Sequence, residues 1–266
     1  MAEKSTKTKI RVVFVGKGGS GKSTIAGTFA QLLARSGAKV VALDSDPMPG
    51  LSYALGLDID DMPIPEDTVI EGPLGGPKWI LKPGTDPEEF LMQYSIPTAD
   101  GVRYFQFGNV QGPWISIVKP QHAWSEVVSK LPQLDWNIVG DVSGGLRQAM
   151  NGWTKYADVA LIVVEPTVKG VITAKQLLKM TKASWGPRIM RIVANKVQSD
   201  DDLEMLEKKL GVPVIGSVPW SPAILEAERA RVSPLVHDPQ GTYVEAVSNL
   251  IPRVLKLYDI PIDQTY

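Results

Sequence analysis

The chain has 266 residues, of which 44% are hydrophobic, enough to bury a sizeable core. Its 28 Lys and Arg residues nearly balance its 29 Asp and Glu residues, so the formal net charge of −1 provides no overall attraction for nucleic acid or an anionic membrane. There is no cysteine, which excludes disulfides, thiolate nucleophiles and an intrinsic iron–sulfur cluster.

The polar N-terminal segment, residues 1–10, passes directly into an apolar run and does not resemble a signal peptide. No apolar run approaches the roughly 18–20 residues that a membrane-spanning helix needs. We therefore expect a cytoplasmic protein.

Short apolar runs alternate with helical stretches along the chain. We expect strands at 12–15, 39–43, 104–107, 136–140, 160–164, 189–194 and 214–217. We expect helices at 22–36, 172–182, 201–210, 223–230 and 243–258, the last with a kink or restart at Pro252. Several strands are apolar throughout, as in parallel sheets covered on both faces. The pattern predicts an α/β fold, a doubly wound and mostly parallel sheet with helices on both faces.

Residues 58–100 interrupt this alternation, because Pro and Gly recur there without a clear periodicity. A structureless insertion of this length is unusual in a compact domain and is more often functional than decorative. We expect one domain over residues 1–266, with a Pro/Gly-rich insertion at about 58–100.

A glycine-rich loop, VGKGGSGKST, lies between the first expected strand and helix. Its glycine spacing fits both a dinucleotide-binding turn and a phosphate-binding P-loop, which both present backbone N–H groups to phosphate. Only a P-loop requires a lysine and a hydroxyl after the last glycine, so that Lys22 meets the β/γ-phosphates and Ser23 meets Mg²⁺. The predicted phosphate-binding residues are Gly16, Lys17, Gly18, Gly19, Ser20, Gly21, Lys22, Ser23 and Thr24.

Two carboxylates, Asp44 and Asp46, end the second expected strand. Residues at i and i+2 of a strand point the same way, and ligands bind at the carboxyl ends of such strands. A dinucleotide-binding protein would place Asp44 on a ribose. The Lys22-Ser23 pair favours the P-loop instead.

Lys17 is an additional lysine inside the loop, and GKGGSGKST resembles the deviant Walker A motif of the septum-site and plasmid-partition (MinD/ParA) ATPases, P-loop NTPases of the SIMIBI class. In these relatives the added lysine reaches across a dimer interface to the partner's nucleotide. A second cation there offsets charge that develops during phosphoryl transfer. The resemblance implies a homodimer with ATP, Mg²⁺ as cofactor, and Lys17, Lys22 and Asp46 as catalytic residues.

The resemblance also assigns roles to the acidic and glycine positions. Asp46 would position the attacking water, and Asp44 would support the Mg²⁺ shell. The run IVGDVSGG resembles a Walker B strand that continues into switch II, so Asp141 would hold Mg²⁺ through water. A backbone N–H near Gly144 or Gly145 would sense the γ-phosphate.

The base pocket is implied by two later segments. In relatives the asparagine of an Asn-Lys pair recognises the adenine edge, because an amide both donates and accepts. Here that pair is Asn195 and Lys196, and GSVPW resembles the loop that completes the pocket with Val218, Pro219 and Trp220. Trp220 could cover the base or simply pack.

Within this family the chain looks most like the nickel-insertion ATPases of carbon monoxide dehydrogenase. That branch carries a Cys-x-Cys metal site where this chain reads QGPWISI, residues 111–117. Trp, Ile and Ser supply no soft ligand for Ni²⁺ or Zn²⁺. The nucleotide switch carries over from this resemblance, but nickel handling does not.

Trp79, Trp114 and Trp124 lie close together in sequence, with two interpretations open. Clustered aromatics are typical of interfaces, and they are equally typical of a small core under a long insertion.

The leading hypothesis is a Mg-ATP switch that dimerises on ATP and acts on an unidentified protein client, for example a metalloenzyme under assembly. A partition or positioning ATPase is an alternative, but the C-terminal basic residues are interleaved with acidic ones and form no stripe. The apolar face at 247–258 fits a helix packed on the sheet better than a membrane anchor. A nitrogenase-like reductase fails for lack of cysteine, and a P-loop small-molecule kinase or ligase stays open.

Overall fold

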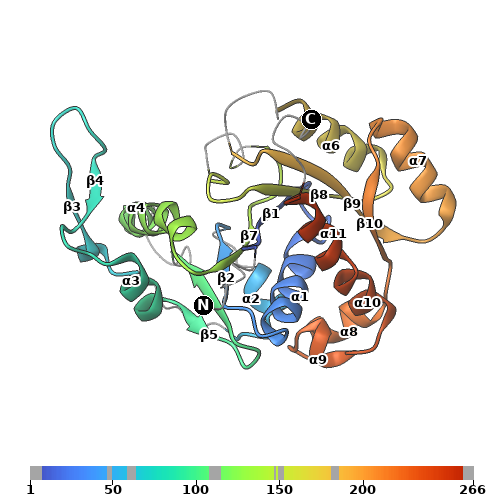
Figure 1. Ribbon diagram of the computed structural model, residues 1–266, viewed down its shortest axis with the longest axis horizontal. Helices are drawn as coiled ribbons and strands as arrows, with labels where there is room; N and C mark the ends of the chain where they lie inside the picture. Colours follow the sequence, from blue (N-terminus) through green and yellow to red (C-terminus); the bar gives the residue numbers. More distant parts are fainter. Residues whose placement is uncertain are drawn as a thin grey trace, which may run out of the picture.

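The computed structural model describes residues 8–46, 50–58, 64–107, 115–146, 148, 153–180 and 186–259. Its main feature is an eight-stranded sheet in the order β10-β9-β8-β1-β7-β2-β6-β5 (Figure 1). The strands are β1 (Arg11–Gly16), β2 (Val40–Asp44), β5 (Ile96–Pro97), β6 (Val102–Gln106), β7 (Asn137–Asp141), β8 (Val159–Val164), β9 (Ile189–Val197) and β10 (Val214–Pro219). All neighbouring strands pair in parallel except the short edge strand β5, which is antiparallel to β6.

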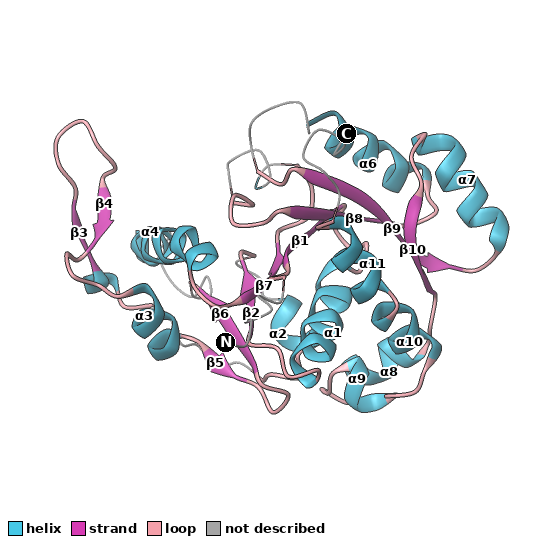
Figure 2. Ribbon diagram, viewed as in Figure 1, coloured by secondary structure: helices cyan, strands magenta, loops and turns pink. Residues whose placement is uncertain are grey.

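Helices flank the sheet on both sides, as the secondary-structure colouring in Figure 2 shows. They are α1 (Lys22–Arg35), α2 (Gly50–Ala54), α3 (Pro87–Tyr94), α4 (Ile115–Lys130), α6 (Val168–Met180), α7 (Asp200–Leu210), α8 (Ala223–Arg229), α9 (Pro234–His237), α10 (Thr242–Ser248) and α11 (Leu250–Leu257). This arrangement confirms the expected doubly wound α/β fold.

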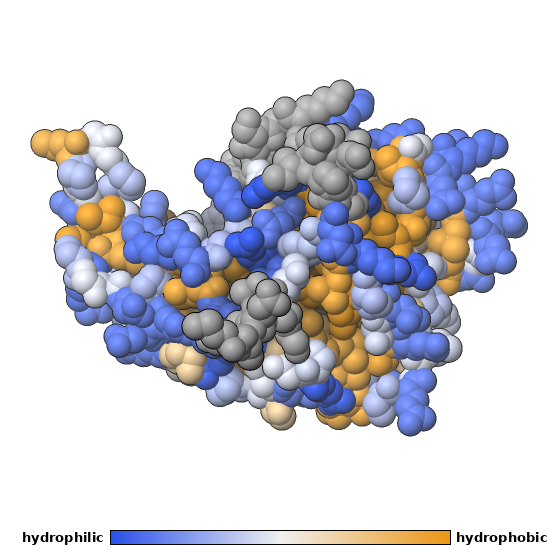
Figure 3. Space-filling model, in the orientation of Figure 1, coloured by the Kyte–Doolittle hydropathy of each residue, from blue (hydrophilic) through white to orange (hydrophobic). Residues whose placement is uncertain are grey.

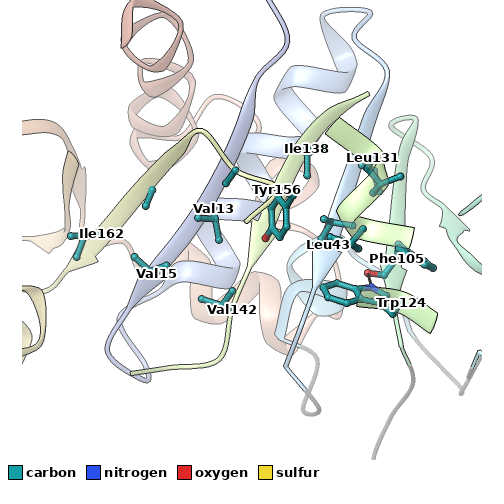
Figure 4. Close-up of a cluster of buried hydrophobic side chains, with 14 of the residues drawn as sticks. Val13, Val15, Leu43, Phe105, Trp124, Leu131, Ile138, Val142, Tyr156 and Ile162 are labelled. Carbon is teal, nitrogen blue, oxygen red and sulfur yellow. Dashed lines mark hydrogen bonds between the residues drawn. The ribbon is translucent and has the colours of Figure 1, made fainter. Parts of the chain in front are cut away.

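Side chains on the two faces of the sheet form two separate hydrophobic clusters. Along β1, Val13 and Val15 contribute to the cluster under α4, α6 and α7, whereas Val12 and Phe14 contribute to the cluster under α1, α10 and α11. This alternation follows from the two-residue period of a strand. Figure 4 shows the first cluster, with Trp124 beside the strands. The sheet is therefore buried on both faces.

The expected strands agree with the structure to within three residues at each end. Helix α6 begins at Val168, four residues before the expected start, because the Thr167 hydroxyl accepts the Gly170 N–H at 3.1 Å and caps the first turn. The expected C-terminal helix is divided at Asn249 into α10 and α11. Pro252 lies in the first turn of α11, where its missing N–H costs no helical hydrogen bond.

The expectation of a structureless stretch at 58–100 is wrong for its described part, 64–100. A hairpin of β3 (Val69–Glu71) and β4 (Trp79–Leu81) is followed by α3. Asp86 caps α3 by accepting the N–H groups of Glu88 and Glu89, and Pro87 occupies its first position. The hairpin projects from the body (Figure 1), and Figure 3 shows hydrophobic side chains on it. Leu74, in the turn between its two strands, is fully exposed.

The tryptophans separate into different environments. Trp124 is buried and packs on Phe105, Phe107 and Trp153, so the core interpretation is correct for this residue. Trp79 is half-buried, with the Lys119 ammonium 4.7 Å from its ring centre. Trp114 lies outside the described residues.

The apolar face near the C-terminus is buried against the sheet, with Val247, Leu250 and Val254 at 0% exposure. The interpretation as a packed helix is therefore confirmed for these positions. Within the described ranges, no helix combines the length and the apolar character that crossing a membrane would require.

Candidate nucleotide-binding site

The glycine-rich loop joins β1 to α1 at the carboxyl edge of the sheet. Gly19 and Gly21 have φ values of 78° and 89°, in the left-handed region that favours glycine. At Gly18 and Gly19 an added Cβ would meet no atom within 4 Å, so this side of the loop is open. A loop with open space before a helix N-terminus is suited to phosphate.

The other side of the loop is closely packed. A Cβ on Gly16 would lie 2.5 Å from the carbonyl oxygen of Val163, and a Cβ on Gly21 would lie 2.2 Å from Asn195 Nδ2. The Val163 backbone at Gly16, and the Asn195 side chain together with a left-handed φ at Gly21, explain why the loop needs glycine at these two positions. The Ser20 hydroxyl is buried and has no hydrogen-bond partner among the described residues.

Lys22 and Ser23 form the first turn of α1. The Lys22 side chain is nearly buried, and its Nζ donates to the Lys17 carbonyl oxygen at 3.2 Å. Ser23 hydrogen-bonds to Asp141, and the charge of Lys22 also acts on that carboxyl. The two residues of this helix turn and the acidic end of β7 therefore interact directly.

Asp44 and Asp141 are direct partners in the register of β2 and β7. Both side chains are buried. Burial, and then the negative charge of Asp141, raise the pKa of Asp44 well above its ordinary value. Burial also raises the pKa of Asp141 to about 6, although Lys22 and the Ser23 hydrogen bond act against this. Two adjacent buried carboxyls with one neighbouring ammonium form a site that a divalent cation would stabilise.

The two carboxyls differ in their remaining hydrogen-bonding capacity. Asp44 accepts the N–H of Asp46 at 2.9 Å, the N–H of Leu51 at 3.3 Å and the Tyr104 hydroxyl at 3.2 Å. By contrast, Asp141 Oδ1 is buried without a hydrogen-bond partner in the described part of the chain. An oxygen of this kind is a fitting Mg²⁺ or water ligand. The contacts favour Asp141 and Ser23 for the metal, whereas Asp44 anchors the chain on both sides of residues 47–49.

Asp46 lies directly after β2. We use the name switch I for the segment that it shares with Ser45. Its backbone N–H is held by Asp44, and its carbonyl oxygen accepts from Gln106 Nε2 at 3.2 Å. The side chain is partly exposed at the edge of the sheet where the glycine loop also lies. A restrained backbone and a partly exposed carboxylate would allow Asp46 to orient a small reactant such as water.

The segment that we call switch II, of which residues 142–146 and 148 are described, follows β7, and its glycines lie on the glycine loop. A Cβ on Gly144 would be 2.6 Å from both the Cα and the N of Gly18. The Gly145 N–H donates to the Gly16 carbonyl oxygen at 2.9 Å. Because of these backbone contacts, a displacement of the glycine loop would also displace switch II.

Lys17 is part of a cluster that the sequence did not predict. Its Nζ lies 3.8 Å from a carboxylate oxygen of Glu165, which directly follows β8. The other oxygen of Glu165 pairs with Lys196 Nζ at 2.5 Å, and Lys196 also donates to the Gly19 carbonyl oxygen at 2.8 Å. A carboxylate just after a parallel strand was the available signal, since such strand ends meet at one edge.

Asn195 lies beneath the glycine loop. Its Nδ2 donates to the Ser20 carbonyl oxygen at 2.7 Å, and only 4% of the residue is exposed. The amide nitrogen thus supports the loop, and contact with an adenine edge stays a prediction for the remaining amide atom.

A cavity of about 390 Å³ opens from the glycine loop toward α2 and α8. Its near wall consists of Gly19, Gly21, Lys22, Ser23, Thr24 and Lys196. The remaining lining residues come from α2, α8 and the segment after α8, and they are mostly apolar apart from Glu228: Gly50, Tyr53, Ala54, Ile224, Ala227, Glu228, Val232 and Pro234. A volume that combines phosphate-binding groups with mostly apolar walls is appropriate for a nucleotide.

The expected pocket residues of β10 lie elsewhere. Val218 is completely buried in the core, and Trp220 is 56% exposed. Neither these two residues nor Pro219 line the cavity. Contact of Val218, Pro219 and Trp220 with the base stays a prediction. The walls from α2 and α8 escaped prediction because their approach depends on tertiary packing.

Comparison with known proteins identifies relatives that span nearly the whole chain. A family model for the CobQ/CobB/MinD/ParA nucleotide binding domain matches residues 12–235. The carbon monoxide dehydrogenase accessory protein CooC of Rhodospirillum rubrum is 28% identical over 239 residues, which cover 84% of this chain and 89% of that protein. An uncharacterised ATP-binding protein of Methanocaldococcus jannaschii is 27% identical over 233 residues, covering 82% and 88%.

A solved structure shares the fold. The septum site-determining protein MinD from Pyrococcus horikoshii, complexed with Mg-ADP, superposes with a TM-score of 0.67. The match covers 95% of this chain and 96% of that one, at 21% identity.

Proposed function

Because the chain belongs to the CobQ/CobB/MinD/ParA nucleotide-binding family, as GKGGSGKST predicted, we propose that it binds and hydrolyses Mg-ATP and dimerises in its ATP state. The family is one of ATP-binding ATPases. The observation that carries the proposal is that Lys22 and Ser23 line the 390 Å³ cavity, while Ser23 also hydrogen-bonds to the buried carboxyl of Asp141 behind it. These three groups supply a cation for phosphate and hard oxygen ligands for a divalent metal.

Each residue has a definite part in this proposal. The loop N–H groups and Lys22 bind the phosphates, and Ser23 and Asp141 hold Mg²⁺, which supplies charge neutralisation when bound. Asp46 orients the attacking water by accepting a hydrogen bond from it, and Gly144 or Gly145 reports the presence of the γ-phosphate. Lys17 acts on the nucleotide of the second subunit.

The first experiment measures equilibrium binding of labelled Mg-ATP to wild type, Lys22→Ala and the exposed control Lys208→Ala on α7. Loss of binding in Lys22→Ala with normal binding in Lys208→Ala is expected, because the P-loop charge is removed. Wild-type affinity in Lys22→Ala would contradict the P-loop assignment.

We further propose that the ATP dimer acts on a protein client, and that this client is a metalloenzyme under assembly. The support is the similarity to CooC, an accessory protein of carbon monoxide dehydrogenase. The chain has no cysteine, so the proposed action is nucleotide-driven and not thiolate-mediated metal transfer.

A rate measurement separates this client from the alternatives. The ATPase rate is compared in the presence of lysate from the native source, anionic vesicles and duplex DNA. Stimulation by a protease-sensitive component of the lysate supports a protein client. Stimulation by vesicles or DNA alone would instead indicate a positioning or partition ATPase.

A further inference from the structure

The side-chain amide of Gln148 joins switch I to switch II. Gln148 Oε1 accepts the Ser143 N–H at 2.8 Å and lies 2.7 Å from the Ser45 hydroxyl. Gln148 Nε2 donates to the Ser45 carbonyl oxygen at 2.6 Å. One side chain therefore contacts the backbone of both segments at once.

The orientation of this amide is determined by its partners. A backbone N–H can only donate, so the amide atom facing Ser143 must be oxygen. A carbonyl oxygen can only accept, so the atom facing Ser45 O must be nitrogen. The flipped amide would oppose donor to donor and acceptor to acceptor. The bridge therefore needs an acceptor toward Ser143 and a donor toward Ser45 on one side chain, which an amide provides.

The bridge connects the glycine loop to the acidic residue of switch I. Ser143 precedes Gly144, whose backbone lies against Gly18 in the glycine loop. Ser45 precedes Asp46, and its hydroxyl is also 3.0 Å from the Asp141 carbonyl oxygen. The hydroxyl has one proton to share between Asp141 and Gln148. A shift of switch II must therefore either move Ser45 or break the Gln148 bridge.

We propose that Gln148 is a positioning residue that couples movement of switch II to the placement of Asp46. The inference rests on the proposed ATPase function, in which Asp46 orients the attacking water. Asp46 is also held by Asp44 and Gln106, so switch I keeps its anchors when the bridge is removed. Loss of Gln148 therefore leaves switch I folded and nucleotide binding intact. It lowers turnover because switch II no longer sets the position of Ser45 and, with it, of Asp46.

The test compares wild type with Gln148→Met, which has similar length and cannot form the bridge. Gln176→Met is the matched control, because Gln176 is exposed on α6. For each protein, equilibrium affinity for a non-hydrolysable Mg-ATP analogue, kcat and thermal melting are measured. We expect analogue affinity within about threefold of wild type in both variants and a kcat at least tenfold lower in Gln148→Met alone.

Two further variants separate the bridge from a general packing defect. Gln148→Asn keeps the amide but is one methylene shorter and cannot reach both segments, so it should show the same loss of kcat. Ser45→Ala should lower kcat in the wild-type background and have a smaller further effect on Gln148→Met, because both changes remove the same contact.

The outcomes are distinct. Wild-type kcat in Gln148→Met or Gln148→Asn would overturn the coupling role, as would fully additive effects with Ser45→Ala. A loss of analogue binding in Gln148→Asn that equals its loss of kcat would also overturn it, in favour of a structural role. Absence of ATPase activity in the wild type would instead overturn the proposed function.

Discussion

The carboxylate of Glu165 lies 3.8 Å from the ammonium of Lys17 within the same subunit. Lys17 is about one-third exposed, and Glu165 is held from the other side by Lys196. A lysine that acts on the nucleotide of a second subunit must leave this pairing. The cis ion pair therefore competes with the proposed dimer contact.

Weakening that pair should favour dimerisation. Glu165→Gln keeps a hydrogen-bonding group for Lys196 but removes the charge that attracts Lys17. A partly exposed ion pair contributes about 0.2–1 kcal/mol, which corresponds to a dimerisation midpoint up to about fivefold lower. Analytical ultracentrifugation over a range of Mg-ATP analogue concentrations measures it, with Glu204→Gln on α7 as the exposed control. A midpoint that is unchanged or higher would show that Glu165 does not restrain Lys17.

Asp46→Ala should separate binding from hydrolysis. If Asp46 only orients water, affinity for ATP stays within about threefold while kcat falls by about 10²-fold or more. The dimer then accumulates with ATP itself and not only with an analogue. Single-turnover hydrolysis and light scattering measure both effects, with Asp259→Ala, an exposed residue in the turn after α11, as control. Unchanged kcat would transfer the catalytic assignment to Asp44 or another group.

Two glycine substitutions should affect different properties, one the stability of the protein and the other its affinity for Mg-ATP. The methyl of Gly144→Ala would lie 2.6 Å from the backbone of Gly18, whereas the methyl of Gly18→Ala meets no protein atom within 4 Å. Overpacking of this kind typically costs about 1–3 kcal/mol, so Gly144→Ala should lower the melting temperature of the free protein. Gly18→Ala should melt like the wild type but bind Mg-ATP more weakly, because its methyl occupies the open side of the loop. Equal melting of all three proteins would show that switch II does not rest on the glycine loop.

Local patterns were sufficient to predict that Asp44 and Asp141 lie at the same edge of the sheet. The strands that carry Asp44 and Asp141 are apolar and end at these carboxylates, and parallel strands bring such ends together. The P-loop depends on glycine, lysine and serine within one short segment. In both cases, the information lies within a few consecutive residues.

Long-range contacts could not be predicted in the same way. Asn195 reaches Ser20 across 175 positions, and Gln148 reaches Ser45 across 103. Nothing in the local sequence distinguishes either amide from one exposed to solvent. The same applies to Trp220, whose position after a strand predicted a role at the base while packing leaves it largely exposed.

The insertion was misjudged for a different reason. Its Pro and Gly residues form turns between short elements, and the Asp86-Pro87 cap was a helix signal within the same stretch. The three-residue strands of the hairpin are too short for an alternating pattern to be recognised.

The central claim is that Lys17 acts across a two-fold interface. If Lys17 served only its own nucleotide, its removal would weaken ATP binding as Lys22→Ala does. If it serves the partner's nucleotide, the separate subunit still binds ATP and fails to dimerise. The most direct measurement is sedimentation velocity of wild type and Lys17→Ala in Mg-ADP and in a non-hydrolysable Mg-ATP analogue. The account predicts a wild-type dimer only with the analogue and a Lys17→Ala monomer in both nucleotides. A wild type that stays monomeric with the analogue, or a Lys17→Ala variant that dimerises equally well, would contradict it.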